Sequence, residues 1–381
     1  MSKVDYINRI FENLNVVDQQ QLEAFYHDLI SAGVIIPSGE GRSKGAISIA
    51  CSEMAKMSHG KRVLDRGDIG FPATDMALAA PILRKRYGQV CLLINSGSGK
   101  SLMPLLDAQK LGVYIENTGQ ARDFRIDLLT SDPESPLGKL SSKYGNYVIV
   151  KGREENGSVV EPREFKTYGI LEDMFSLGSG LLTHSVAEAM WQEAPASKVL
   201  TICRELASET SNIVDDFVSS DFFRHLIDSL EQRKTCFFAG LGSSQEVVRM
   251  AAVRVGHVKR ALGDSVYVSG DSNIAPPRAG DVMIVVSMTG ETEIVAGWCR
   301  NFRKMGGEVA SIVGSQGSTI ESLSDASYVL KGDWRPGAPN SFYIKAAFVL
   351  SPLPIYLVER IEEKGLKLPE NILRWHRSVI S

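Results

Sequence analysis

Internal repetition is the feature of this 381-residue sequence that most restricts its fold. Segments of the first half reappear, in the same order, in the second half. Each copy has an apolar run leading into Gly-x-Gly-x-Ser and an alanine-rich helical pattern, then a short run ending in Gly-Asp, then an apolar run entering a Ser/Gly/Thr loop. These segments are residues 34–57, 61–68 and 90–101 in the first copy and residues 236–259, 264–271 and 281–292 in the second. The chain is therefore predicted to be two copies of one module.

The repeat unit alternates strand patterns with helix patterns, and its strands are apolar throughout. Such strands are typical of a parallel sheet that is covered by helices on both faces. Two further matching segments, at residues 124–141 and 307–324, and a last apolar run in each copy give five predicted strands per module. We place the boundary within residues 195–198, which gives domains 1–196 and 197–381. In α/β folds of this kind, ligands bind at the carboxyl ends of the strands, where both Ser/Gly/Thr loops fall.

The first of these loops, LLINSGSGKS at residues 92–101, resembles the end of a nucleotide-binding P-loop. A P-loop needs a glycine five positions before Gly99, but Ile94 stands there, inside the apolar run. The repeat has Glu291 where the lysine of a P-loop would face a polyphosphate. The Gly-x-Gly-x-Ser turns also lack the third glycine of a dinucleotide-binding turn at the required place. The sequence thus argues against a nucleotide.

Both copies share the pattern Ser-x-[Ser/Thr]-Gly-x-[Ser/Thr] in the loop and a serine in the preceding turn. Clustered hydroxyls beside the free N–H groups of a helix N-terminus suit a single phosphate monoester. The alternative is ordinary helix capping by serine and threonine. The predicted phosphate-binding residues are Ser43, Ser96, Ser98 and Ser101 in the first copy and Ser244, Ser287, Thr289 and Thr292 in the second.

Composition narrows the class of protein further. The formal net charge is −3 and no basic block is present, which argues against a nucleic-acid partner. The longest apolar stretch, residues 346–358, contains two prolines and is too short to span a bilayer. The first twenty residues do not resemble a signal peptide. The five cysteines are scattered and show no metal-ligand spacing, so we expect reduced core residues in a cytoplasmic protein.

Both halves resemble the sugar isomerase (SIS) domain, a module that binds phosphosugars in isomerases and in regulators. The resemblance rests on SGSGKS and SMTGET and on TSDPESPLGKLS at residues 130–141. Within the family, GEGRSKG and RVGHVKRALGDSVYVSG are similar to segments of the 6-phospho-3-hexuloisomerases. The resemblance implies two tandem SIS domains of flavodoxin-like αβα architecture, related by a pseudo-twofold axis. The layout is similar to the isomerase half of glucosamine-6-phosphate synthase, and further self-association as a homodimer is expected.

The resemblance also implies a reaction, the isomerisation of a sugar phosphate through a cis-enediol without metal or other cofactor. By loose correspondence with a glutamate of the hexuloisomerases, Glu172 is the candidate base. A family histidine corresponds to His257 in the second copy, where the first copy has Lys56. A site shared between the halves would use both residues. The alternatives are a solvated acid at a helix start for Glu172 and an ordinary helix histidine for His257.

Some positions depart from the family pattern. Lys100 replaces the usual acid of the loop, and Arg254 stands where the first copy has Glu53. We name Lys100, Arg42 and Arg254 as candidate anion contacts, the alternative being exposed solubilising charges. Departures from the family pattern in both copies would also suit a non-catalytic phosphosugar sensor. An amino-sugar isomerase or deglycase is a further alternative, because some relatives act on amine-bearing sugars. The expected partner in each case is a small sugar phosphate.

Overall fold

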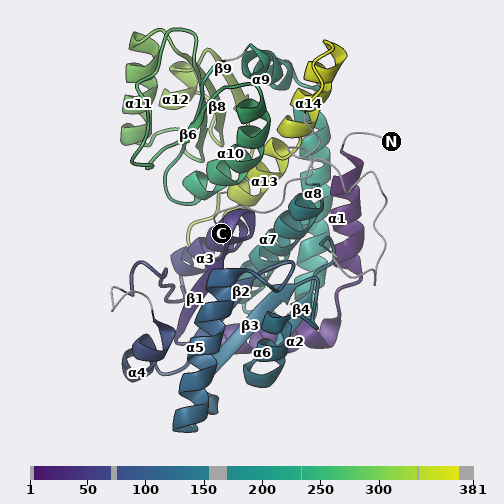
Figure 1. Ribbon diagram of the computed structural model, residues 1–381, viewed down its shortest axis with the longest axis vertical. Helices are drawn as coiled ribbons and strands as arrows, with labels where there is room; N and C mark the ends of the chain where they lie inside the picture. The colour runs from purple at the N-terminus through teal and green to yellow at the C-terminus, as the bar shows by residue number, and fades with distance from the viewer. Residues whose placement is uncertain (1–3, 70–74, 154–169, 233, 333, 369–381) are drawn as a thin grey trace.

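The computed structural model describes residues 4–69, 75–153, 170–232, 234–332 and 334–368 (Figure 1). The first half contains, in chain order, α1 (Asp5–Asn15), α2 (Gln19–Ser31), β1 (Val34–Gly39), α3 (Gly41–Lys56), α4 (Met76–Tyr87), β2 (Val90–Asn95), α5 (Leu102–Thr118), β3 (Phe124–Thr130), α6 (Pro136–Tyr144), β4 (Tyr147–Ile149) and α7 (Ile170–Trp191). Short 3₁₀ turns, η2 (Ala121–Asp123) and η4 (Ala196–Lys198), precede β3 and link the halves.

The second half repeats most of this order, with a strand (β6) but no helix at the place of α4 and with one more helix at its end. It contains α8 (Val199–Ser219), α9 (Asp221–Glu231), β5 (Cys236–Ala239), α10 (Ser243–Ala261), β6 (Val266–Val268), β7 (Val282–Ser287), α11 (Glu293–Lys304), β8 (Glu308–Val313), α12 (Thr319–Ser322), β9 (Ala326–Val329), α13 (Phe342–Leu350) and α14 (Leu353–Glu363). Both halves thus have the predicted alternation of strands and helices.

The second sheet has the five predicted strands, all parallel, in the order β6-β5-β7-β8-β9. This order places the second strand outside the first, which is the flavodoxin-like arrangement. β7 lies in the middle of the sheet, and all six of its residues are buried. Its apolar sequence is explained by helices on both faces of the sheet.

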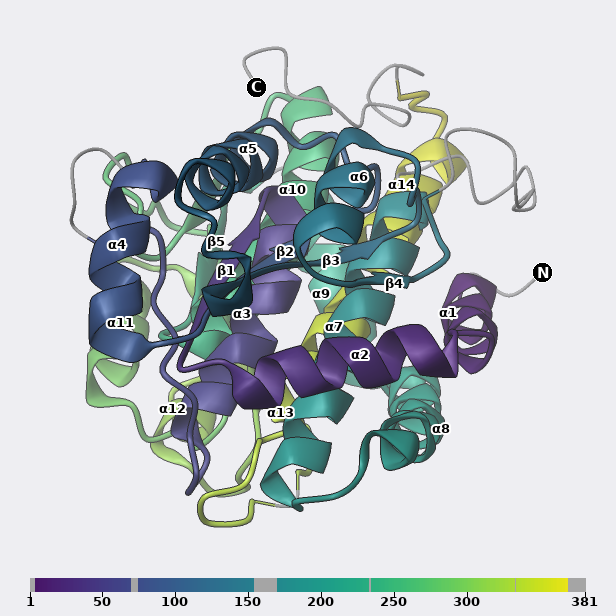
Figure 2. The same ribbon diagram turned by 90° about the horizontal axis from the view of Figure 1, so that it is seen from below.

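The first sheet is smaller than predicted. It has four parallel strands in the order β1-β2-β3-β4, with helices on both faces (Figure 2). The expected outer strand at residues 61–68 is reduced to a single parallel bridge between Ile35 and Val63. Only Val63 and Leu64 are apolar in KRVLDRGD, and five of the other six residues are charged. With so little apolar surface to bury, the ladder stops after one bridge.

One continuous hydrophobic core joins the halves and includes residues from α3, α7, α10 and α13. α3 and α10, which are equivalent in the repeat, pack against each other in opposite directions (Figure 1). At one end Lys56 Nζ donates to Ser243 Oγ over 3.0 Å, and at the other Arg42 donates to the Met250 carbonyl over 2.8 Å. A pseudo-twofold axis produces such an antiparallel pair. The boundary between residues 196 and 197 follows α7 but remains a prediction, because the core crosses it.

All five cysteines lie in this fold as buried free thiols. The segment Phe342–Glu363 is apolar and long enough to cross a membrane by length and composition. It comprises α13 and α14, and 83% of its most apolar window is buried inside the protein. Its apolar character is therefore accounted for by packing in the core.

The core also holds an ionisable side chain, His184 of α7, which is 2% exposed. Its Nδ1 atom has no hydrogen-bond partner in the described part of the structure. Burial, followed by the nearby charges of Lys345 and Arg335, lowers the pKa of His184 from 6.5 to about 4. Between about pH 4 and pH 6.5, the unfolded chain therefore binds more protons at His184 than the folded chain does. The free energy of unfolding therefore falls as the pH drops through this window, by ~3 kcal/mol in total.

We expect the His184→Gln variant to be less sensitive to acid than the wild-type protein. Urea unfolding at pH 7 and at pH 4.5 measures how much stability each protein loses. The variant should lose about 2 kcal/mol less between the two pH values, because glutamine does not titrate. An equal loss in both proteins would show that protonation of His184 does not contribute to acid unfolding.

Candidate functional site

The first hydroxyl-rich loop lies at the carboxyl end of β2, at the entrance to α5. Ser96 Oγ lies 2.8 Å from Ser101 Oγ, and the backbone N–H of Lys100 donates to Ser98 Oγ over 3.3 Å. Ser96 and Ser98 are buried, whereas Ser101 is partly exposed. The structure thus brings the three predicted serines together in one turn at a helix N-terminus, where N–H groups favour an anion.

The second loop has the same construction between β7 and α11. The N–H of Gly290 donates to Ser287 Oγ over 3.2 Å, and the N–H of Glu291 donates to Thr289 Oγ1 over 3.1 Å. Thr289 is exposed and Thr292 is partly exposed. The two loops therefore present similar hydroxyl groups at equivalent edges of their sheets.

The capping alternative for these hydroxyls can be compared with the structure at two positions. Ser101 is the N-cap of α5 and Thr292 is the N-cap of α11. Neither side chain accepts a capping hydrogen bond from its helix. Simple helix capping therefore does not account for the hydroxyl at the end of either loop.

Each loop contains a glycine that the fold requires. Gly99 and Gly290 have φ values of 61° and 69°, which favour glycine. A Cβ atom at Gly99 would lie 1.8 Å from Ser135 Oγ, and one at Gly290 would lie 2.1 Å from Ser318 Oγ. Ser135 and Ser318 are both buried and begin α6 and α12. Sequence reasoning did not assign these serines to the site, although Ser135 belongs to the quoted TSDPESPL segment.

Lys100, which departs from the family pattern, and its counterpart Glu291 each contact a residue at or just before the next helix. Lys100 Nζ lies 4.0 Å from Asp132 Oδ2, in the loop before α6. Its counterpart Glu291 accepts hydrogen bonds from the N–H and the hydroxyl of Thr319, over 2.9 and 2.6 Å, at the start of α12. These bonds lower the pKa of Glu291. Lys100 thus lies near a carboxylate of the protein itself. The charge at this loop position matches its neighbour: the lysine lies near Asp132, and the acid Glu291 accepts from the donors of Thr319.

The serines of the Gly-x-Gly-x-Ser turns lie at the start of the helices that join the halves. Ser43 Oγ is 3.3 Å from Ser176 Oγ of α7, and Ser244 is buried in the first turn of α10. Gly97 of the first loop also abuts α7, because a Cβ there would lie 2.9 Å from the Phe175 ring. The turn after β1, the loop after β2 and the first turns of α7 therefore meet in one place, which we call the first crevice.

A buried network of charges crosses from one half to the other at the first crevice. The Asp173 carboxylate of α7 forms ion pairs with Arg42 of α3 and with Arg254 of α10. Asp173 is 0% exposed, Arg42 is 6% exposed and Arg254 is 4% exposed. The anion that the two candidate arginines contact is thus a carboxylate of the protein. Asp173 was not predicted from the sequence. The available indication was Arg254, whose positive charge has no counterpart in the first copy, where Glu53 stands.

This network joins the two helices that carry the candidate catalytic residues. Glu172 lies in the first turn of α7, immediately before Asp173; its side chain falls outside the described part of the structure. His257 is exposed on α10, three residues after Arg254, or about 5 Å along the helix. Glu172 is thus next to one partner of this ion pair in the sequence, and His257 lies one helical turn after the other partner. The first crevice therefore has residues from both halves at its edge.

The equivalent place in the second half, which we call the second crevice, is chemically different. The buried Glu53 carboxylate accepts hydrogen bonds from Ser243 Oγ over 3.1 Å, from the N–H of Asn340 over 3.0 Å and from Lys56 Nζ over 2.7 Å. Lys56 Nζ also lies 4.9 Å from the centre of the Tyr343 ring. Burial, followed by the nearby Glu53 charge, raises the pKa of Tyr343 to about 12.

Among the described residues, no group of three or more His, Cys, Asp and Glu side chains is arranged to hold a metal ion. The two crevices are thus defined by hydroxyl groups, helix N-termini and ion pairs. The first has a carboxylate held between two arginines, and the second has a carboxylate held by a lysine, a serine and a backbone N–H.

Comparison with known proteins gives both a sequence resemblance and a fold. No family model matches the chain. It is 30% identical over 131 residues to the 3-hexulose-6-phosphate isomerase of Mycobacterium gastri, which covers 34% of this chain and 62% of that relative. The chain thus spans less than two thirds of the length of this relative. The resemblance to hexuloisomerases that the motifs predict is confirmed.

Solved structures of low sequence identity match nearly the whole chain. The tagatose-6-phosphate ketose/aldose isomerase of Escherichia coli superposes with a TM-score of 0.57 at 12% identity, over 95% of this chain and 90% of that protein. The C-terminal domain of glucosamine-fructose-6-phosphate aminotransferase from Francisella tularensis does so with a TM-score of 0.53 at 11% identity, over 93% and 96%. These matches confirm the predicted tandem fold.

Proposed function

We propose that the protein is a phosphosugar isomerase that interconverts ketose or aldose 6-phosphates through a cis-enediol at the first crevice. The single observation that carries the proposal is the Asp173–Arg254 ion pair. It joins α7, which carries Glu172, to α10 of the other half, which carries His257. The sequence resemblance to a 3-hexulose-6-phosphate isomerase supports the same reaction class.

The hydroxyl loop holds the phosphate of the substrate. Ser96, Ser98 and Ser101 surround the N-terminus of α5, and hydroxyl and N–H donors at such an end suit a monophosphate dianion. Binding through the phosphate fixes the sugar chain relative to α7 and α10. Because the phosphate does not react, its binding energy serves to orient the reacting carbons.

The proton transfers are assigned to the residues from the two halves. The Glu172 carboxylate removes a proton from the carbon that bears the hydroxyl group beside the carbonyl, which gives a cis-enediol. The same group then returns the proton to the neighbouring carbon, while His257 carries a proton between the two oxygens. Asp173 and Arg254 do not touch the substrate in this scheme; they position the two helices.

Matched substitutions in the two loops test which crevice acts. In Ser96→Ala/Ser98→Ala, we expect kcat/KM for exchange of solvent deuterium into fructose 6-phosphate to fall about a hundredfold, because two hydrogen bonds to a charged group are lost. The matched Ser287→Ala/Thr289→Ala variant should stay within about twofold of wild type. Mass spectrometry of the recovered sugar phosphate measures both. Equal losses in the two variants would contradict the assignment to the first crevice.

A second candidate function is a non-catalytic phosphosugar sensor. The observation that favours it is the second crevice, which keeps the hydroxyl loop but has Lys56 and Tyr343 at its edge. A sensor would be stabilised thermally by the sugar phosphate, since a ligand that binds only the folded state raises its stability. It would exchange no deuterium at any protein concentration.

A further inference from the structure

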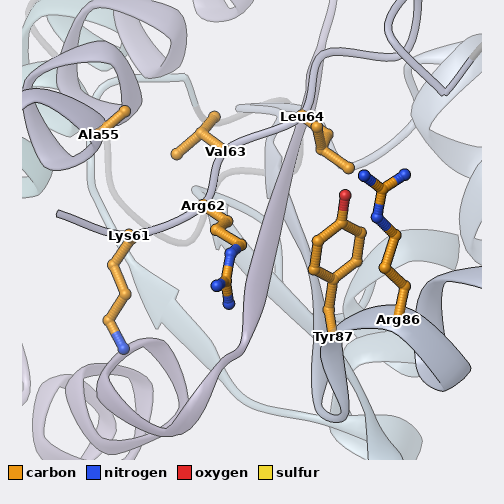
Figure 3. Close-up of a pocket in the computed structure, with 7 residues that line it drawn as sticks. All are labelled: Ala55, Lys61, Arg62, Val63, Leu64, Arg86 and Tyr87. Atoms are coloured by element: carbon orange, nitrogen blue, oxygen red, sulfur yellow. The ribbon is translucent and has the colours of Figure 1, made fainter.

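A pocket separate from both crevices lies at the other end of the first sheet (Figure 3). It has a volume of about 510 Å³, within the range of small-molecule sites. All of its lining residues come from the first half: Ala55, Lys61, Arg62, Val63, Leu64, Arg86 and Tyr87. Three of the seven are cations and none is acidic, which distinguishes this pocket from the paired charges of the crevices.

The two arginines of the pocket have no acidic partner among the described residues. Arg62 and Arg86 contact the Tyr87 ring, with guanidinium carbons 5.8 and 5.4 Å from its centre. Neighbouring cations differ, since Arg66 pairs with Asp107 at 3.0 Å and Arg84 pairs with Asp123 at 2.5 Å. Two exposed guanidinium groups thus lie by the same tyrosine ring without an acidic partner among the described residues. Guanidinium groups bind phosphate through two parallel hydrogen bonds, so the pair is suited to phosphate.

Lys61 is the third cation that lines the pocket. Lys61 is partly buried, and its Nζ atom donates to the carbonyl of Ala32 over 3.2 Å and also to the carbonyl of Ile30. Both of its described acceptors are uncharged, so the positive charge of Lys61 is not neutralised by them. A ligand with a single negative charge would leave most of the charge of the pocket uncompensated.

The position of the pocket separates it from the phosphate-binding loops. Val63 bridges Ile35 near the start of β1, and Tyr87 ends α4 just before β2 begins. The hydroxyl loop and the Gly-x-Gly-x-Ser turn follow the far ends of these strands. Six residues of strand span about 20 Å, so one ligand of ordinary size does not reach from the pocket to the loops.

We propose that this pocket binds a phosphorylated small molecule with two or more negative charges, such as one carrying a diphosphate group. Arg62 and Arg86 hold the phosphate groups from either side of Tyr87, as the arrangement in Figure 3 allows. Val63, Leu64 and Ala55 provide an apolar wall for the carbon skeleton. Aromatic stacking on Tyr87 is not part of the recognition, because its ring is already in contact with both guanidinium groups.

Isothermal titration of the full chain with inorganic pyrophosphate tests the proposal. The Arg62→Gln/Arg86→Gln variant should bind pyrophosphate about tenfold more weakly, or worse, because charge-assisted contacts are lost. The Arg122→Gln/Lys139→Gln variant removes the same charge from exposed positions outside the pocket and should bind like wild type. Adding Arg62→Gln/Arg86→Gln to the Ser96→Ala/Ser98→Ala variant should weaken pyrophosphate binding by the same factor, which separates the pocket from the first loop.

Hydrogen exchange locates the binding and distinguishes the sources of phosphate. Pyrophosphate should protect amides in residues 61–64 and 86–89, and organic ligands with two phosphate groups, such as ADP or fructose 1,6-bisphosphate, should do so at lower concentration if the apolar wall contributes. Protection by pyrophosphate as strong as that by the organic ligands would remove the wall from the proposal. Unchanged affinity in Arg62→Gln/Arg86→Gln, an equal loss in Arg122→Gln/Lys139→Gln, or no binding by wild type would overturn it.

Discussion

Replacing Asp173 by asparagine is expected to lower the free energy of unfolding by about 3–5 kcal/mol, the largest loss of stability that we predict for this chain. The amide keeps the shape of the carboxylate but removes its charge. Arg42 and Arg254, which come from different halves, would then be buried beside a neutral amide instead of a carboxylate. The pairing therefore stabilises the contact between the halves as well as the start of α7.

Urea unfolding at pH 7, followed by circular dichroism, measures the effect. The matched control is Asp221→Asn, which breaks the exposed ion pair with Arg224 and should cost less than about 1 kcal/mol. If Asp173→Asn fails to fold, Arg254→Lys keeps the charge while removing the planar guanidinium and should show a smaller loss of the same kind. A loss below about 1 kcal/mol in Asp173→Asn would mean that the carboxylate does not hold the halves together.

The repeat explains why so much of the fold could be predicted. The apolar runs at β1, β2, β5 and β7, each followed by a glycine-containing turn, correspond to strands in the structure. The outer strand at residues 61–68 was not predictable in the same way, because its length depends on how much apolar surface the edge can bury. The second copy has VYV at this place and forms a strand; the first has only Val63 and Leu64 between charges.

The site was only partly accessible from sequence. The hydroxyl loops could be located, since Ser96 to Ser101 and their counterparts follow buried strands directly. The role of Arg42 and Arg254 could not be predicted, because it depends on a helix crossing between segments more than two hundred residues apart. Asp173 has the appearance of an ordinary helix acid in the sequence. The difference in charge between Glu53 and Arg254 was a visible sign that the two crevices had diverged, together with the differences between Lys56 and His257 and between Lys100 and Glu291.

The Glu172→Gln variant is expected to lose deuterium exchange by a factor of about 10² to 10⁴ while binding fructose 6-phosphate nearly as tightly as wild type. Glutamine is similar in size but does not accept a proton, so it removes general-base catalysis without removing the phosphate contacts. Exchange is followed by mass spectrometry, and binding by thermal shift. Glu205→Gln, at an exposed position on α8, serves as the control and should exchange at the wild-type rate. Unchanged exchange in Glu172→Gln would remove this residue from the role of base.

Incubation of the wild-type protein with fructose 6-phosphate in deuterated water is the most direct test of the proposed isomerase activity. Removal and return of a carbon-bound proton by a protein group introduces solvent deuterium into the sugar, whichever isomer is favoured at equilibrium. The account predicts one deuterium per molecule at a carbon next to the carbonyl, at a rate proportional to protein concentration. Thermal stabilisation by the same sugar phosphate without any incorporation of deuterium would contradict it and would favour a sensor.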